Sequence, residues 1–274
     1  MDFSTHESES AFNQKLRRQE LVVGTWVNTL KDPVIAKIIG AAGFDYMMVD
    51  AEHSGATMGS LSEMCLLARE CGVFPIIRPT DADDVKMNGR LLDAGAMGLL
   101  ASHIENAAQV DKVAKSLRYF NGGTRGCNTR SIFSGFAKMT EEAMHKADEN
   151  VTCIISFESA EAIAQADEIL AVPGVDIAII GRGDLSHDVG VPGNQEHDKV
   201  LSLVEKVFAA ATRQNKMVGL LVNNADEAKK WIAQGAGFVT LGSEVGWLLS
   251  AYQTNIPLVR SAPGRMSAGV KNNG

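Results

Sequence analysis

Long apolar runs, paired cysteines and concentrated positive charge are all missing from this 274-residue chain. No apolar run approaches the roughly 20 residues that a membrane-spanning helix needs. Residues 1–20 are polar and contain no hydrophobic core segment, so we expect no secretory signal. The four cysteines show no Cys-x-x-Cys spacing, which disfavours a zinc site or a disulfide framework. We expect reduced thiols in a cytoplasmic protein without a membrane partner.

Basic residues are too few to suggest a nucleic-acid partner. Lysine and arginine total 26 against 33 aspartate and glutamate residues, and the net charge is -7. Without a basic stripe to offset that charge, we expect no general nucleic-acid binding. Individual arginines can still bind an anionic substrate. Hydrophobic residues make up 45% and charged residues 22%, which is typical of a globular enzyme.

Short apolar segments alternate with helical segments along the chain. Eight segments are predicted to be strands because they are apolar, often β-branched and bounded by glycine or polar residues: residues 21–27, 46–50, 73–78, 95–101, 153–157, 175–180, 217–222 and 237–242. Helices are predicted at residues 33–42, 58–70, 85–94, 105–119, 140–147, 198–215, 225–234 and 245–253.

This rhythm predicts a single-domain (β/α)8 TIM barrel. We divide the chain into an N-terminal tail with a short helix (1–20), the catalytic barrel (21–260) and a C-terminal tail (261–274). A doubly wound open sheet is the alternative, but no Gly-x-Gly-x-x-Gly turn follows the first strand.

Two successive strands end in an acid. Glu158 follows the strand at 153–157, and Asp184 follows the strand at 175–180 within the sequence Gly-Arg-Gly-Asp-Leu-Ser. Two acids at adjacent strand ends can share a hard divalent cation, which prefers oxygen ligands and keeps some water. The alternative is that Asp184 caps the next helix and Glu158 is a solvated loop acid.

The other strand ends supply a base, a cation and an apolar wall, and catalytic residues of such barrels lie at these ends. The residues concerned are Trp26, Asp50, Glu52, His53, Arg78 and Val222. A histidine such as His53 can exchange a proton near neutral pH, although a structural role is the alternative. The planar guanidinium of Arg78 suits a carboxylate ligand, although a salt bridge to Asp50 or Asp93 is possible. No lysine ends a strand, which disfavours a Schiff base.

Taken together, these residues resemble the HpcH/HpaI aldolases, which are class II, metal-dependent pyruvate aldolases built on a TIM barrel. The resemblance extends over residues 21–249 and rests on six motifs: Asp50-x-Glu52-His53, Arg78-Pro79, Leu92-Asp93-Ala94-Gly95-Ala96, Tyr119-x-x-x-Gly123-x-Arg125-Gly126, Glu158 and Gly181-x-x-Asp184-Leu185-Ser186.

The resemblance implies roles for these residues. Glu158 and Asp184 would hold Mg²⁺, Mn²⁺ or Co²⁺, which would chelate a pyruvate unit. Arg78 would stabilise the enolate, and His53, assisted by Asp50 and Asp93, would move protons on the aldol hydroxyl. The backbone at Gly183 and Asp184 would hold the pyruvate carboxylate, with Trp26, Ser156 and Val222 lining the pocket. The resemblance also implies a homo-oligomer, either a hexamer or a trimer of dimers, that exchanges its last helix.

The chain departs from the family pattern around the mouth of the site. Gly181-Arg182-Gly183-Asp184 replaces Gly-Pro-Ala-Asp, Ser156 replaces a glutamine, and Ala101-Ser102-His103 replaces Val-Pro-Met. We expect Arg182 and His103 to contact substrate and to favour an aldehyde that carries a carboxylate.

The predicted function is a carbon–carbon lyase that cleaves or forms 4-hydroxy-2-oxo acids through a pyruvate enolate. The substrates would be a small 2-oxo acid and an aldehyde. A decarboxylase or Claisen-type synthase acting on oxaloacetate-like substrates is one alternative, and a non-catalytic anion-binding barrel is another.

Overall fold

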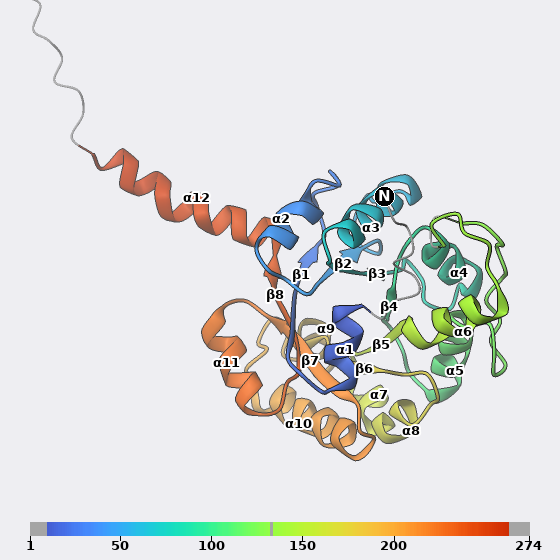
Figure 1. Cartoon of the computed structure of the whole chain (residues 1–274). Coiled ribbons are helices and arrows are strands. Elements are labelled where there is room, and N and C mark those ends of the chain that lie inside the picture. Colours follow the sequence, from blue (N-terminus) through green and yellow to red (C-terminus); the bar gives the residue numbers. More distant parts are fainter. Residues whose placement is uncertain (1–9, 132–133, 263–274) are drawn as a thin grey trace, which may run out of the picture.

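Eight parallel strands close into one barrel in the computed structural model, which describes residues 10–131 and 134–262. The strands follow one another around the barrel in sequence order, and β8 pairs with β1 (Figure 1). They are β1 (Val22–Val27), β2 (Tyr46–Asp50), β3 (Phe74–Arg78), β4 (Gly98–Ala101), β5 (Thr152–Phe157), β6 (Ile177–Ile180), β7 (Met217–Val222) and β8 (Phe238–Ser243). The predicted single-domain (β/α)8 barrel is confirmed.

Helices follow the strands in the predicted order. They are α1 (Ala11–Arg17), α2 (Ile35–Ala41), α3 (Met58–Glu70), α4 (Val85–Asp93), α5 (Ala107–Ser116), α6 (Glu141–Asn150), α7 (Ala160–Ala164), α8 (Ala166–Leu170), α9 (Arg182–Asp188), α10 (Asp198–Arg213), α11 (Ala225–Ala233) and α12 (Glu244–Arg260). The short helices α7, α8 and α9 were not predicted, because each is too brief to show a helical period in the sequence. None of the described helices is long and apolar enough to cross a membrane.

Most strand residues are buried on both faces of the sheet. Successive side chains point to opposite sides of a strand, so one set fills the barrel and the other packs under the helices. Tyr46 and Phe238 stack inside the barrel with ring centroids 4.3 Å apart. Gly24 makes room for them, because a Cβ there would lie 2.3 Å from the Tyr46 ring. Val49 and Val222 belong to the outer set, under the helices.

Helix α1 closes the N-terminal end of the barrel. Phe12 is buried with the barrel-filling residues and stacks on Phe74, the first residue of β3, at 4.1 Å between centroids. This packing joins the predicted short N-terminal helix to the barrel, while the division of the chain at residues 20 and 260 stays a prediction. Residues 1–9 of the expected N-terminal tail and residues 263–274 of the expected C-terminal tail lie outside the described residues.

Helix α2 starts later than the predicted residue 33, whereas α10 starts at the predicted residue 198. Asp32 and Pro33 precede α2 instead of opening it, because the Asp32 carboxylate accepts the N–H of Val34 in a turn. The cap of α10 is His197, whose Nδ1 accepts the N–H of Lys199, and Asp198 is the first helical residue.

Helix α12 is longer than predicted and leaves the barrel. It continues to Arg260 instead of ending near residue 253, and Figure 1 shows it extending away from the body of the molecule. Large apolar side chains along it are exposed, including Leu249, Tyr252 and Val259. The chain therefore presents an apolar helix that its own barrel does not cover.

Candidate active site

A cavity of about 470 Å³ opens among the C-terminal ends of the strands. Most of the predicted site residues line it: Trp26, Asp50, His53, Arg78, Ser156, Glu158, Arg182, Gly183 and Asp184. The barrel thus brings together residues from five strand ends that lie far apart in the sequence.

The two predicted metal acids lie on neighbouring strands at the wall of this cavity. Glu158 follows β5, and Asp184 lies in the first turn of α9, directly after β6. The Glu158 side chain covers Gly181, where a Cβ would lie 2.7 Å from its Cγ. Glycine at this position therefore lets the two acidic segments approach each other.

These residues fit a divalent cation that takes part of its coordination from outside the protein. Within residues 10–131 and 134–262, no group of three or more His, Cys, Asp and Glu side chains is placed to hold a metal. A cation between Glu158 and Asp184 would therefore need water or substrate oxygens, which Mg²⁺ commonly keeps. Both donors are carboxylates, so a hard cation suits them better than a soft one.

Burial raises the pKa of Glu158, and the nearby charge of Asp184 adds to that rise. Hydrogen bonds act in the opposite direction. The Ser156 hydroxyl donates to Oε1 at 2.8 Å, and the backbone N–H of His103 donates to Oε2 at 3.0 Å. Ser156 is thus a positioning partner of Glu158, and a bound cation would offset the unfavourable burial of its charge.

Arg78 is held by two acids and one aromatic ring. Its Nε and Nη2 donate to the two oxygens of Asp50 at 3.0 and 2.7 Å, and its Nε lies 3.2 Å from Glu52 Oε2. The guanidinium also lies 4.7 Å from the Trp26 ring centroid. The salt bridge to Asp50 that the sequence left open is therefore present, and it fixes Arg78 at the cavity wall.

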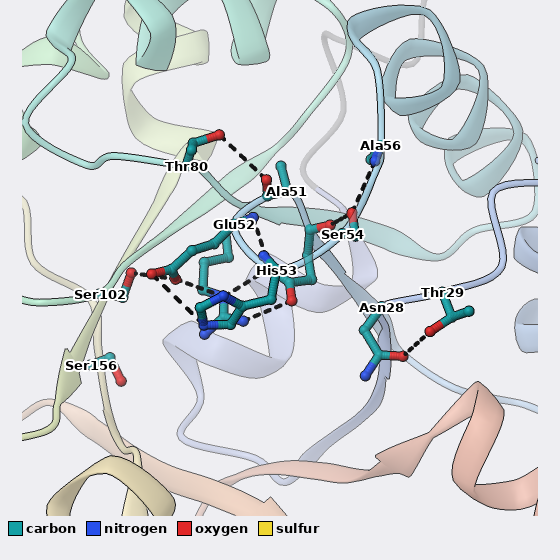
Figure 2. A network of polar contacts seen from close by, with 12 residues as sticks. Asn28, Thr29, Ala51, Glu52, His53, Ser54, Ala56, Thr80, Ser102 and Ser156 are labelled. Atoms are coloured by element: carbon teal, nitrogen blue, oxygen red, sulfur yellow. Dashed lines mark hydrogen bonds and ion pairs between the residues drawn. The ribbon is translucent and has the colours of Figure 1, made fainter.

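Glu52 connects the β2 loop to the β4 loop, a role that was not predicted. Its carboxylate accepts the Ser102 hydroxyl at 3.0 Å (Figure 2). It also lies 2.6 Å from Nε2 of His103. Burial lowers the pKa of His103, but the hydrogen bond to Glu52 and the charge of Glu158 outweigh burial and raise it. His103 is thus tied to two acids at the mouth. The prediction that it contacts substrate remains untested.

His53 lies at the cavity rim with 68% of its side chain exposed. Its Nε2 is 3.9 Å from Glu52 Oε1, while its backbone N–H donates to Asp50 Oδ1 at 3.2 Å. Asp50 therefore positions the backbone of His53 and does not contact a ring nitrogen. The nearest acid to the imidazole among these contacts is Glu52.

Three predicted residues do not line the cavity: His103, described above, Asp93 and Val222. Asp93 ends α4, on the chain just before β4 begins, and pairs with Nη2 of Arg125 at 3.2 Å. A residue between a helix and the following strand lies at the N-terminal end of the barrel, away from the site. Val222 is fully buried in the outer core, and Leu221 lines the cavity in its place. Neither Asp93 nor Val222 therefore lines the cavity, and their predicted roles stay predictions.

Arg182 lines the cavity but does not supply the predicted free positive charge. Its side chain is 2% exposed and is paired with Glu196 at 3.0 Å and with Glu227. Its Nη2 also donates to the Leu221 carbonyl at 2.9 Å. Arg182 therefore adds no uncompensated positive charge to the mouth, because two carboxylates from other segments neutralise it.

A neutral polar wall of the cavity was not predicted. Asn28 and Thr29 after β1, Asn223 after β7 and Gln195 before α10 all line the cavity. Asn28 and Asn223 directly follow predicted strands, so their positions alone were a usable signal. The buried carboxylate of Glu244 accepts the successive backbone N–H groups of Asn28, Thr29 and Leu30, which fixes this wall.

Known proteins resemble the chain over most of its length. The family described as HpcH/HpaI aldolase/citrate lyase matches residues 23–251. A hydroxypyruvate/pyruvate aldolase of Pseudomonas aeruginosa is 31% identical over 94% of this chain and 93% of that protein. A 4-hydroxy-2-oxo-heptane-1,7-dioate aldolase of Escherichia coli is 28% identical over 89% of this chain and 92% of that protein. The crystal structure of an HpcH/HpaI aldolase from Desulfitobacterium hafniense DCB-2 superposes with a TM-score of 0.88 at 30% identity, covering 94% of this chain and 99% of that one.

Proposed function

The chain belongs to the HpcH/HpaI aldolase/citrate lyase family and is a metal-dependent carbon–carbon lyase, and we propose that it cleaves or forms 4-hydroxy-2-oxo acids through a pyruvate enolate. One observation carries this proposal. The carboxylates of Glu158 and Asp184 and the guanidinium of Arg78 line one cavity at the strand ends. Breaking a bond β to a ketone leaves charge on an enolate oxygen, and such a site is suited to hold that charge.

The proposed aldol cleavage needs no oxidant or reductant, because the electrons of the broken bond stay in the products. In the cleavage direction the C4 hydroxyl loses its proton, the C3–C4 bond breaks, and its electrons pass into the enolate as the aldehyde leaves. The enolate carbon then takes up a proton and becomes the methyl group of pyruvate. A divalent cation held by Glu158 and Asp184 supplies a Lewis acid for the oxygens of the 2-oxo acid.

The chain's own residues bind, orient and move protons. Arg78, fixed by Asp50 and stacked on Trp26, directs its positive charge at the developing oxyanion. His53 at the rim takes and returns the proton of the aldol hydroxyl. The backbone N–H groups of Gly183 and Asp184 hold the pyruvate carboxylate, and a glycine at 183 leaves that approach open. Mg²⁺, Mn²⁺ and Co²⁺ are the cations we propose.

We also propose a homo-oligomer in which α12 packs on a second copy, as a hexamer or a trimer of dimers. The exposed apolar residues of α12, such as Leu249 and Tyr252, support it, as does exposed Ile38 on α2. Sedimentation of the chain and of the double variant Leu249→Ser with Tyr252→Ser tests this, since the variant should sediment as a smaller species. The four free cysteines support a reducing, cytoplasmic location.

Deuterium exchange into the methyl group of pyruvate tests the function without knowledge of the aldehyde. NMR should show exchange with Mg²⁺, Mn²⁺ or Co²⁺, loss of exchange with EDTA, and loss in Glu158→Gln. Glu161→Gln, a matched change at an exposed residue on α7, should retain it. Absence of exchange with every metal would contradict the proposal. Oxaloacetate then distinguishes the alternatives, because a decarboxylase releases CO₂ from it and a Claisen-type synthase consumes it together with a thioester.

A further inference from the structure

The cavity has two chemically different sides. The ends of β2, β3, β5 and β6 contribute its charged residues, which hold the 2-oxo acid in the function proposed above. The ends of β7, β8 and β1, with the loop before α10, contribute neutral amides and hydroxyls: Asn28, Thr29, Gln195, Asn223, Thr240 and Ser243. An electrophile that meets the enolate must extend toward this neutral side, because the charged side is occupied by the 2-oxo acid.

No lining arginine or lysine is left over for a second carboxylate among the described residues. The two lining cations are Arg78 and Arg182. Arg78 pairs with Asp50 and Glu52, and Arg182 pairs with Glu196 and Glu227. His53, at the rim, lies near the same Glu52 carboxylate. A carboxylate on the electrophile would therefore lose water without gaining an uncompensated cation, which is unfavourable.

The neutral side is held in place by the fold. Glu244, 6% exposed, accepts the backbone N–H groups of Asn28 and Thr29, the latter at 2.6 Å. The Asn28 side-chain oxygen accepts the Thr29 hydroxyl at 3.2 Å (Figure 2), so its amide nitrogen faces the other way as a donor. Asn223 is also held in place, because its backbone N–H and its Nδ2 both donate to Glu227 Oε2. Fixed neutral donors and acceptors of this kind match a hydroxyl group.

The geometry points to a short, uncharged hydroxyaldehyde as the electrophile, with its hydroxyl hydrogen-bonded by Asn28. This inference rests on the proposed aldol function and refines its substrate class. In the synthetic direction the enolate carbon bonds to the aldehyde carbon, the C=O π bond opens, and its oxygen takes a proton. The product would carry one carboxylate, in contrast to the 1,7-dioate in the name of the Escherichia coli relative.

Competition between aldehydes tests the inference, with pyruvate and the metal that supports methyl exchange. The kcat/KM for glycolaldehyde and glyceraldehyde should exceed that for succinic semialdehyde by at least about ten-fold, because a mismatched polar site rejects a substrate by that order or more. Equal or better turnover of succinic semialdehyde would overturn the inference while leaving the aldolase proposal intact. If methyl exchange itself is absent, the aldolase proposal fails first, and the inference falls with it.

A single variant assigns the effect to Asn28. Asn28→Ala should lower kcat/KM for glycolaldehyde by about five- to ten-fold, the cost of one lost hydrogen bond, and leave acetaldehyde, which has no hydroxyl, within about two-fold. Asn194→Ala, which removes an exposed amide from the adjoining surface and not from the cavity, is the matched control and should change neither. Equal losses for both aldehydes in Asn28→Ala would show that the residue does not read the hydroxyl.

Discussion

Arg78 binds both oxygens of Asp50, with Nε 3.0 Å from Oδ1 and Nη2 2.7 Å from Oδ2. The same carboxylate accepts the backbone N–H groups of Glu52 and His53, so one buried acid sets the positions of the cation and of the loop that carries the histidine. A bidentate pair of this kind has a single geometry, which a lysine cannot reproduce.

Arg78→Lys should therefore impair catalysis while retaining the positive charge. We expect pyruvate methyl exchange to fall by about 100-fold, the usual cost of removing one oriented donor from a developing oxyanion. The exchange rate at saturating pyruvate checks this, with the circular dichroism spectrum as a control for folding. A loss of less than about three-fold would indicate that charge alone is sufficient at this position.

Lowering the pH should destabilise the fold, because it protonates the Asp50 carboxylate. Burial raises the pKa of its carboxyl, but the hydrogen bond and charge of Arg78 outweigh burial and hold that pKa below the ordinary value of 3.8. A carboxyl whose pKa is lowered by folding adds stability above its unfolded pKa, and that stability is lost as the pH falls through the folded pKa. Urea unfolding should show Asp50→Asn to be about 3 kcal/mol less stable than wild type at pH 7, with the difference shrinking below about pH 4. A difference that grows on acidification would contradict this sign.

Replacing Arg182 should lower the stability of the fold without changing the preference between carboxylated and neutral aldehydes. Arg182→Met leaves Glu227 and Glu196 without their shared partner, and the hydrogen bond to the Leu221 carbonyl is lost as well. We expect a loss of about 3 kcal/mol in the free energy of unfolding, as for other broken buried pairs. KM should change by the same factor for carboxylated and neutral aldehydes. Lys199→Met, at an exposed position on α10, serves as a control.

Glu244 should hold the β1 loop against the cavity. Glu244→Ala removes the acceptor of three backbone N–H groups, and we expect hydrogen–deuterium exchange at residues 28–30 to accelerate markedly, with a loss of about 2 kcal/mol in stability. Glu205→Ala, on the exposed face of α10, should leave exchange at those residues unchanged. Unaltered exchange in Glu244→Ala would show that the loop is held by other contacts.

The sequence by itself determined the barrel and the position of each strand end. Short apolar segments at regular spacing allow few arrangements, and parallel closure then brings Asp50, Arg78, Glu158 and Asp184 to one end whatever the details of packing. The predicted strands match the observed ones closely for this reason. The sequence left a salt bridge of Arg78 to Asp50 or Asp93 open as an alternative, and the structure shows the pair with Asp50.

Only the tertiary structure decided which partners neutralise a charge and which way a buried side chain points. Arg182 meets Glu196 and Glu227 because α9, the following loop and α11 converge, and no spacing along the chain reveals that contact. Asp93 ends α4 and pairs with Arg125 instead of lining the cavity, and the sequence did not show this contact. A parallel strand is apolar on both faces, so the sequence of β7 does not show that Leu221, and not Val222, lines the cavity.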